Sequence, residues 1–135
     1  MENNKLLFIE LSAKSSLQER LKALEKILNR VDFSEFIDEK DKVGIKTHIG
    51  DRDNDTHIAP ELIALSVKKI REQKALPFIT ETSTLYSGAR SNAITHLELA
   101  QKHGFTYKKL GAPFIMSDGL LGNTSRTTRS NKQRL

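Results

Sequence analysis

The chain has 135 residues, of which 37% are hydrophobic and 6% aromatic, and this length suits one domain with a modest core. It contains no cysteine, which excludes disulfides, thiolate zinc sites, a cysteine nucleophile and an iron–sulfur cluster held by four thiolates. No segment approaches the roughly eighteen consecutive apolar residues of a membrane span, and the N-terminal apolar run is too short for a signal-peptide core. We therefore expect a cytoplasmic protein without a membrane partner.

The net charge of +5 arises at the C-terminal end of the chain. Residues 123–135 carry four basic residues and no acidic ones, which leaves 18 basic against 17 acidic residues in the rest. The body therefore shows no nucleic-acid footprint, and basic residues without aromatics give the tail only a weak, salt-sensitive attraction. Because the tail is rich in Ser, Thr, Asn and Gln, we expect a folded domain over 1–122 and a disordered basic tail over 123–135.

The first half of the chain predicts two strands and a helix between them. KLLFIEL (5–11) is typical of a short buried strand, and Ser16 with Glu19 forms a capping box that begins a helix with leucines at helical spacing. A connector over 31–40, with a helical turn, leads to a second strand over 42–49.

The second half continues the alternation. Pro60 fits the first turn of a second helix, which leads to a third strand over 76–82. A third helix is expected from about Asn92 to His103, where Gly104 is a good terminator, and a fourth strand lies within 106–116.

This order predicts an α/β fold with a Rossmann-like three-layer arrangement and a small, mostly parallel four-stranded sheet. Four strands are few for a doubly wound sheet, so we expect an incomplete domain. Its uncovered edge or face would need a partner.

Polar clusters follow the second, third and fourth predicted strands, and ligands of parallel sheets settle outside the carboxyl ends of the strands. Two of these loops end at helix N-termini, and lysine and arginine side chains lie nearby, so the pattern predicts a small anionic ligand: phosphate, carboxylate or a nucleotide. The alternative is that these residues are solvated or cap the helices. The expected ligand-binding residues are Lys46, His48, Arg52, Asn54, Thr82, Tyr86, Arg90 and Asn92.

The same loops offer a candidate metal site. His48, His57, Glu81 and Asp118 could converge from three loops, and histidine with carboxylates suits zinc, iron or manganese. The alternative is a hydrogen-bonded structural histidine, the role expected for the two histidines of the third helix. Because Walker A, G-x-G-x-x-G, H-E-x-x-H and G-x-S-x-G motifs are all missing, the sequence leaves the reaction open.

Three blocks carry a family resemblance: KVGIKTHIGDRDNDTHIAPELI, PFITETSTLYSGARSNAITHLELAQKHGFT and GAPFIMSDGLLG. In order and spacing they resemble the domain of unknown function 362 family over roughly residues 5–122. Glu81 stands where the family pattern often has aspartate, which lengthens that side chain. The positions that match the family's polar blocks are Lys46, His48, Gly50, Thr82, Tyr86, Gly88, Arg90, Asn92 and Asp118.

The resemblance implies an α/β domain that longer members extend with a ferredoxin-like segment binding two 4Fe–4S clusters. No such segment is present here, so the chain is expected to be a truncated or frameshifted N-terminal portion of a larger family domain. We expect an anion- or metal-binding domain of an iron–sulfur-associated redox protein. The alternative is a non-enzymatic module that packs against a missing cluster domain or, as a homodimer, against a second copy.

Overall fold

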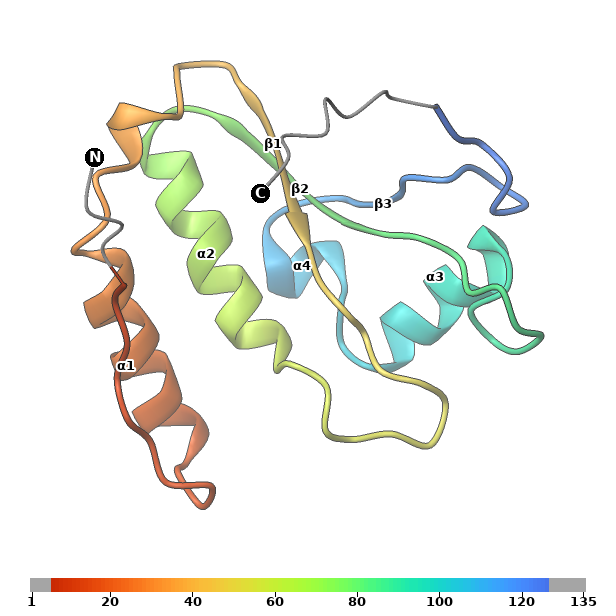
Figure 1. Ribbon diagram of the computed structural model, residues 1–135, viewed down its shortest axis with the longest axis horizontal. Coiled ribbons are helices and arrows are strands. Elements are labelled where there is room, and N and C mark those ends of the chain that lie inside the picture. The colour runs from red at the N-terminus through yellow and green to blue at the C-terminus, as the bar shows by residue number, and fades with distance from the viewer. Residues whose placement is uncertain (1–5, 127–135) are drawn as a thin grey trace, which may run out of the picture.

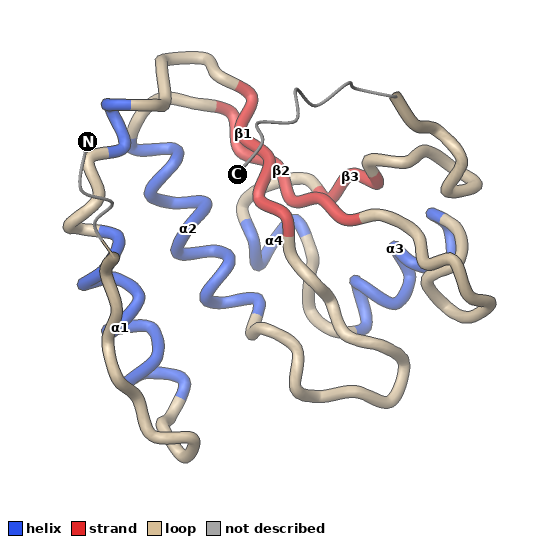
Figure 2. Tube along the Cα trace, viewed as in Figure 1, coloured by secondary structure: helices blue, strands red, loops and turns tan. Residues whose placement is uncertain are grey.

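A computed structural model describes residues 6–126 of the chain (Figures 1 and 2). Strands and helices alternate from the second third of the chain onward, as an α/β fold requires. In chain order the elements are α1 (Leu17–Leu28), the 3-10 turn η1 (Phe33–Glu35), β1 (Lys42–Lys46), α2 (Pro60–Glu72), β2 (Leu76–Glu81), α3 (Ala93–Lys102), α4 (Tyr107–Leu110) and β3 (Phe114–Met116).

The three strands form one parallel sheet in the order β1-β2-β3. In the register, Ile45 of β1 lies beside Ile79 of β2, and Ile79 lies beside Phe114 of β3. Because side chains alternate along a strand, these three residues share one face of the sheet. The predicted α/β class and parallel pairing are confirmed.

The core lies between that face and the helices. Ile79 packs with Val67 of α2, Leu99 of α3 and Leu110 of α4, all buried. Helices α2, α3 and α4 therefore cover the same side of the sheet, which the ribbon also shows (Figure 1). Since β1, β2 and β3 follow one another in one direction, right-handed crossovers place their helices on one side.

Local sequence signals set the helix ends as expected. Ser16 and Glu19 form the predicted capping box at the start of α1. Pro60 occupies the first turn of α2, where its missing N–H leaves no helical bond unmade. Gly104 follows the end of α3 with φ of +86°, a conformation that glycine adopts without steric cost.

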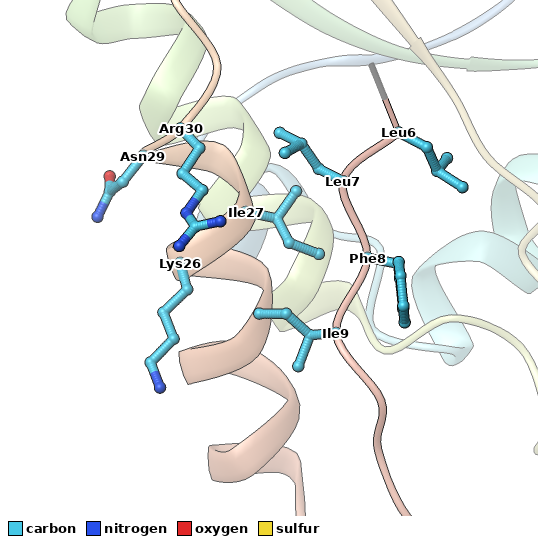
Figure 3. A pocket seen from close by; sticks show the side chains of 8 residues that line it. All are labelled: Leu6, Leu7, Phe8, Ile9, Lys26, Ile27, Asn29 and Arg30. Carbon is cyan, nitrogen blue, oxygen red and sulfur yellow. The ribbon is translucent and has the colours of Figure 1, made fainter. Parts of the chain in front are cut away.

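The predicted strand over 5–11 is wrong for the residues described. Residues 6–11 are extended without regular structure and run beside α1 (Figure 2). Leu6 is 84% exposed and Phe8 is 77% exposed, whereas Leu7 and Ile9 are turned toward α1 (Figure 3). The apolar pattern of a buried strand is present, but no neighbouring strand pairs with it in the described part of the chain.

The predicted strand within 106–116 is confined to its last three residues, because Tyr107–Leu110 is helical. The Thr106 side chain accepts a hydrogen bond from Lys109 N–H and begins α4, and Gly111 ends it with φ of +71°. Only Phe114–Met116 pairs with β2. The sheet therefore has three strands instead of four, and residues 6–126 form two layers instead of three.

Residues 123–126 are exposed and lack regular structure, whereas the rest of the expected tail, 127–135, lies outside the described residues. Among the helices of residues 6–126, none has the length and apolar character needed to cross a membrane.

Candidate functional site

The carboxyl ends of β1 and β2 meet at a buried carboxylate, Glu81. Its side chain is the last of β2 and only 4% of the residue is exposed. Glu81 Oε2 accepts hydrogen bonds from His96 Nε2, at 3.2 Å, and from the Ile49 N–H, at 3.4 Å. Its other oxygen lies 3.6 Å from Arg90 Nη1. Groups from three segments therefore converge on this carboxylate.

The surroundings of Glu81 favour its ionised form. Burial raises the pKa of Glu81, but the hydrogen bonds from His96 and Ile49 and the nearby charge of His48 and His96 outweigh it. The pKa therefore lies below the ordinary value for glutamate. With one oxygen hydrogen-bonded and the other in an ion pair with Arg90, Glu81 acts as a fixed negative charge, and it is a weak proton acceptor.

Arg90 links the loop after β1 to the loop after β2, at the edge of the sheet where the two strands end; we call this edge the rim. Its Nη2 donates to Tyr86 Oη at 2.6 Å and lies 3.5 Å from Asp51 Oδ2. Tyr86 Oη in turn donates to Asp51 Oδ2 at 3.2 Å. The loop after β1, which holds Asp51, is thus joined to the loop after β2 through a charged hydrogen-bond network.

His48 lies against the same guanidinium. Arg90 Nη1 is 3.0 Å from His48 Nε2, and the Gly50 N–H donates to His48 Nδ1 at 3.0 Å. Lys46, the last residue of β1, has a side chain that is 71% exposed and an ammonium 4.0 Å from Glu81. Four expected ligand-binding residues are therefore gathered at one rim: Lys46, His48, Tyr86 and Arg90.

The other part of the loop after β1 faces elsewhere. Arg52, Asn54 and His57 line a separate open cavity of about 580 Å³ beside the end of α3. There the ring of His57 stacks on that of His103, with centroids 4.7 Å apart and planes 7° apart. Both rings donate from Nδ1 to backbone carbonyls, of Asn54 and Ile49 respectively. These contacts hold the loop against α3.

The remaining expected residues have structural partners. Asn92 Oδ1 accepts from the Thr95 N–H and caps α3. Asp118 Oδ2 accepts from the Ser83 N–H at 2.6 Å, which ties the segment after β3 to the loop after β2. Thr82 is exposed directly after β2.

The four expected metal ligands are not brought together. Within residues 6–126, no three histidines or carboxylates lie close enough to share one metal ion. His57 stacks on His103 and Asp118 bonds Ser83, whereas His48 and Glu81 share the cationic neighbour Arg90, whose charge repels a divalent cation. A 4Fe–4S cluster does not fit either, because the chain has no cysteine thiolate to hold it.

His96 is a buried, hydrogen-bonded structural histidine, as expected. Sequence reasoning did not predict that its partner, reached from α3, is Glu81. The sequence signal is the spacing of Ala93, His96 and Ala100, which places His96 on the buried side of that helix.

A cavity of about 640 Å³, which shares no residue with this polar network, lies between the N-terminal segment and α1 (Figure 3). Leu7, Ile9 and Ile27 point into it, and its polar lining comes from the last turn of α1 and the residues that follow. Its apolar walls mark it as a gap under a loosely packed segment.

The fold and the rim together define a small parallel α/β domain with a buried, hydrogen-bonded carboxylate at the strand ends. The sequence-family model for the domain of unknown function DUF362 matches residues 43–134, which are more than half of the chain. The protein therefore belongs to this family. The matched range begins after α1 and runs past Asn123, so it differs at both ends from the expected 5–122. No curated protein and no solved structure matches the chain.

Proposed function

We propose that the rim formed by Lys46, His48 and Arg90 binds a small oxyanion, such as a carboxylate or phosphate group. One observation carries the proposal: hydrogen-bond donors outnumber acceptors around His48. Arg90 Nη1 and the Gly50 N–H face its two ring nitrogens, both at 3.0 Å. An imidazole accepts through at most one nitrogen, so at least one of these donors needs another acceptor.

A second donor of Arg90 also lacks an acceptor. Arg90 Nε is buried and has no hydrogen-bond partner among the described residues. Buried donors without partners cost about 1–3 kcal/mol each, and an oxyanion supplies several acceptor sites at once. Arg90 already faces the charges of Glu81 and Asp51, so its contribution is hydrogen bonding more than neutralisation.

Lys46 supplies the free positive charge. Its side chain is largely exposed, and its closest carboxylate, Glu81, is 4.0 Å away, at the limit of an ion pair. An exposed ammonium on a flexible stem can move to meet a ligand at little cost. The ligand would thus be held between a mobile cation outside and fixed donors inside.

A thermal-shift titration with inorganic phosphate and with malonate, at constant ionic strength, tests the proposal. A ligand at 100 times its dissociation constant adds about 2.7 kcal/mol of stability. We expect one of the two anions to raise the Tm of the wild type but not of Lys46→Ala. Lys68→Ala, which changes an exposed lysine on α2, is the matched control and should show the same rise as the wild type. No rise with either anion, or the same rise in both variants, would refute the oxyanion site.

Association with iron–sulfur redox proteins is the second part of the proposal. Family membership supports it, together with the resemblance to longer cluster-bearing members. Without cysteine, this chain would serve such a cluster only through contact with another chain or domain. Absorbance at about 400 nm in a co-purified complex tests this part, because 4Fe–4S clusters absorb there and this chain alone does not.

A non-enzymatic interaction module is the alternative function. The specific observation in its favour is that α2, α3 and α4 cover only one face of the parallel sheet. A second copy and a cluster-bearing domain are both proposed occupants of the other face. The mass of the chain in solution separates a self-associating module from a monomer that awaits a different partner.

A further inference from the structure

One face of the sheet carries no helix from residues 6–126 (Figure 1). The strand register identifies its residues: Lys42 lies beside Leu76, Gly44 beside Phe78, and Thr80 beside Ile115. Leu76 is 52% exposed and Ile115 is 48% exposed. We call the surface formed by these six residues the open face.

An uncovered face is unusual for this type of sheet. Parallel sheets occur almost only with both faces covered, because crossover connections bring helices to each side. Here the Phe78 ring lies across Gly44, and a Cβ on that glycine would be 2.9 Å from the tip of the ring. Because Gly44 has no side chain, the Phe78 ring can lie over it, and the middle of the open face is apolar and without protruding groups.

The dimensions of the open face favour a single helix as its occupant. Three strands about 4.8 Å apart, of five, six and three residues, make a surface on the order of 200 Å². A stable dimer of globular domains buries about 800 Å² on each partner. An α-helix with its side chains is about 10–12 Å wide, close to the width of three strands.

The charge of the open face specifies the flanks of that helix. Lys42 lies at its β1 edge, with Lys46 four residues further along the same strand, and neither aspartate nor glutamate belongs to the face. Acidic side chains beside the apolar stripe of a helix would pair with these lysines, whereas basic ones would be repelled.

We infer that the open face docks an amphipathic helix with acidic flanks, supplied by a partner protein. The helix lays its apolar stripe on Leu76, Phe78 and Ile115, and it acts as the helical layer that the second face of a parallel sheet normally has. This inference rests on the interaction-module alternative, and it shares only Lys46 with the proposed oxyanion site.

Two synthetic helical peptides of about 18 residues, or five turns, test it. They share one Leu/Ile/Ala stripe and differ in flanks of Glu or Lys, and fluorescence anisotropy measures the Kd of each for the full chain. We expect the Glu peptide to bind at least about tenfold more tightly than the Lys peptide, with Lys42→Glu narrowing that preference. Leu76→Gln should weaken binding of the Glu peptide by about tenfold.

Leu85→Gln is the matched control, because Leu85 is fully exposed on the loop after β2 and lies off the open face. It should change the Kd less than about twofold. Equal binding of both peptides, no binding of either, or equal losses in the two leucine variants would overturn the inference. A wild-type dimer that Leu76→Gln dissociates in sedimentation would also overturn it, and would leave the interaction module standing with a second copy as occupant.

Discussion

Nε2 of His96 lies 3.2 Å from Oε2 of Glu81, and both side chains are buried where β2 meets α3. Because a carboxylate only accepts hydrogen bonds, this contact requires a proton on Nε2 of His96. Nδ1 of the same ring is buried and has no hydrogen-bond partner in the described structure. The pair therefore holds the end of β2 to α3 and keeps a negative charge under Arg90.

Replacing this charge should destabilise the domain. Glu81→Gln keeps the shape of the side chain but leaves the Arg90 guanidinium with less opposing charge in a buried site. We expect a loss of about 3 kcal/mol in the free energy of unfolding, measured by urea denaturation. Glu98→Gln, an exposed change on α3, should cost less than about 0.5 kcal/mol. Similar losses in the two variants would contradict this role for Glu81.

The pH dependence of stability should carry the signature of Glu81. Its pKa is lower in the folded chain than its ordinary value of 4.5, so the carboxylate contributes stability above that value. This contribution is lost as the pH falls through the lowered pKa. Urea midpoints from pH 7 to pH 3 should therefore show the wild type losing its advantage over Glu81→Gln below about pH 4.5. A constant difference across that range would show that the charge is not responsible.

Asn92 should act through the helix that it caps. Its side chain accepts from the Thr95 N–H at 3.1 Å, so Asn92→Ala should cost about 1 kcal/mol of stability. Asn92→Ser retains a side-chain oxygen and should recover most of the loss. Thermal unfolding of the three proteins measures the effect. An Asn92→Ala variant as stable as the wild type would mean that the cap is not needed.

Gly50, the one glycine of the loop after β1, should not tolerate a side chain. It has φ of +86°, and a Cβ there would lie 2.8 Å from His57 Nδ1, so Gly50→Ala combines backbone strain with a clash. We expect a loss of about 2–3 kcal/mol in urea unfolding and a displaced His57 ring. NMR of the ring protons should report the broken stack on His103.

Gly88→Ala is the matched control, because Gly88 also has a positive φ, of +159°, but nothing lies within 4 Å of a Cβ there. It should lose only the part due to backbone strain, about 1–2 kcal/mol. If the two glycine variants lose the same stability, then crowding by His57 is not what makes Gly50 necessary.

The helix starts and the central strands were predictable because local signals specify them. The Ser16–Glu19 box and Pro60 each determine a helix start through groups within one turn. The segment Leu6–Leu11 has the same apolar character as β2, but strand formation needs a neighbour, and pairing is not a local property. Within 106–116, the Thr106 cap and Gly111 outweighed strand propensity.

The position of the candidate site could be predicted from the sequence, but its full set of residues could not. Parallel strands end at one edge, so Lys46 and Glu81 had to lie close together, and Arg90 joins them from the next loop. The loop from β1 to α2 is long enough to reach two surfaces, and sequence order does not tell which residues face each. For that reason Asn54 and His57 were grouped with a rim on which they do not lie.

The one-directional order of the sheet has a consequence for how the chain assembles. Each strand pairs with the strand made just before it, β1 with β2 and β2 with β3. The first β–α–β unit contains Ile45, Val67 and Ile79, so their mutual contacts need no residue of β3. As the chain leaves a ribosome from its N-terminus, each strand becomes available after the strand with which it pairs, and β3 is the last of the three.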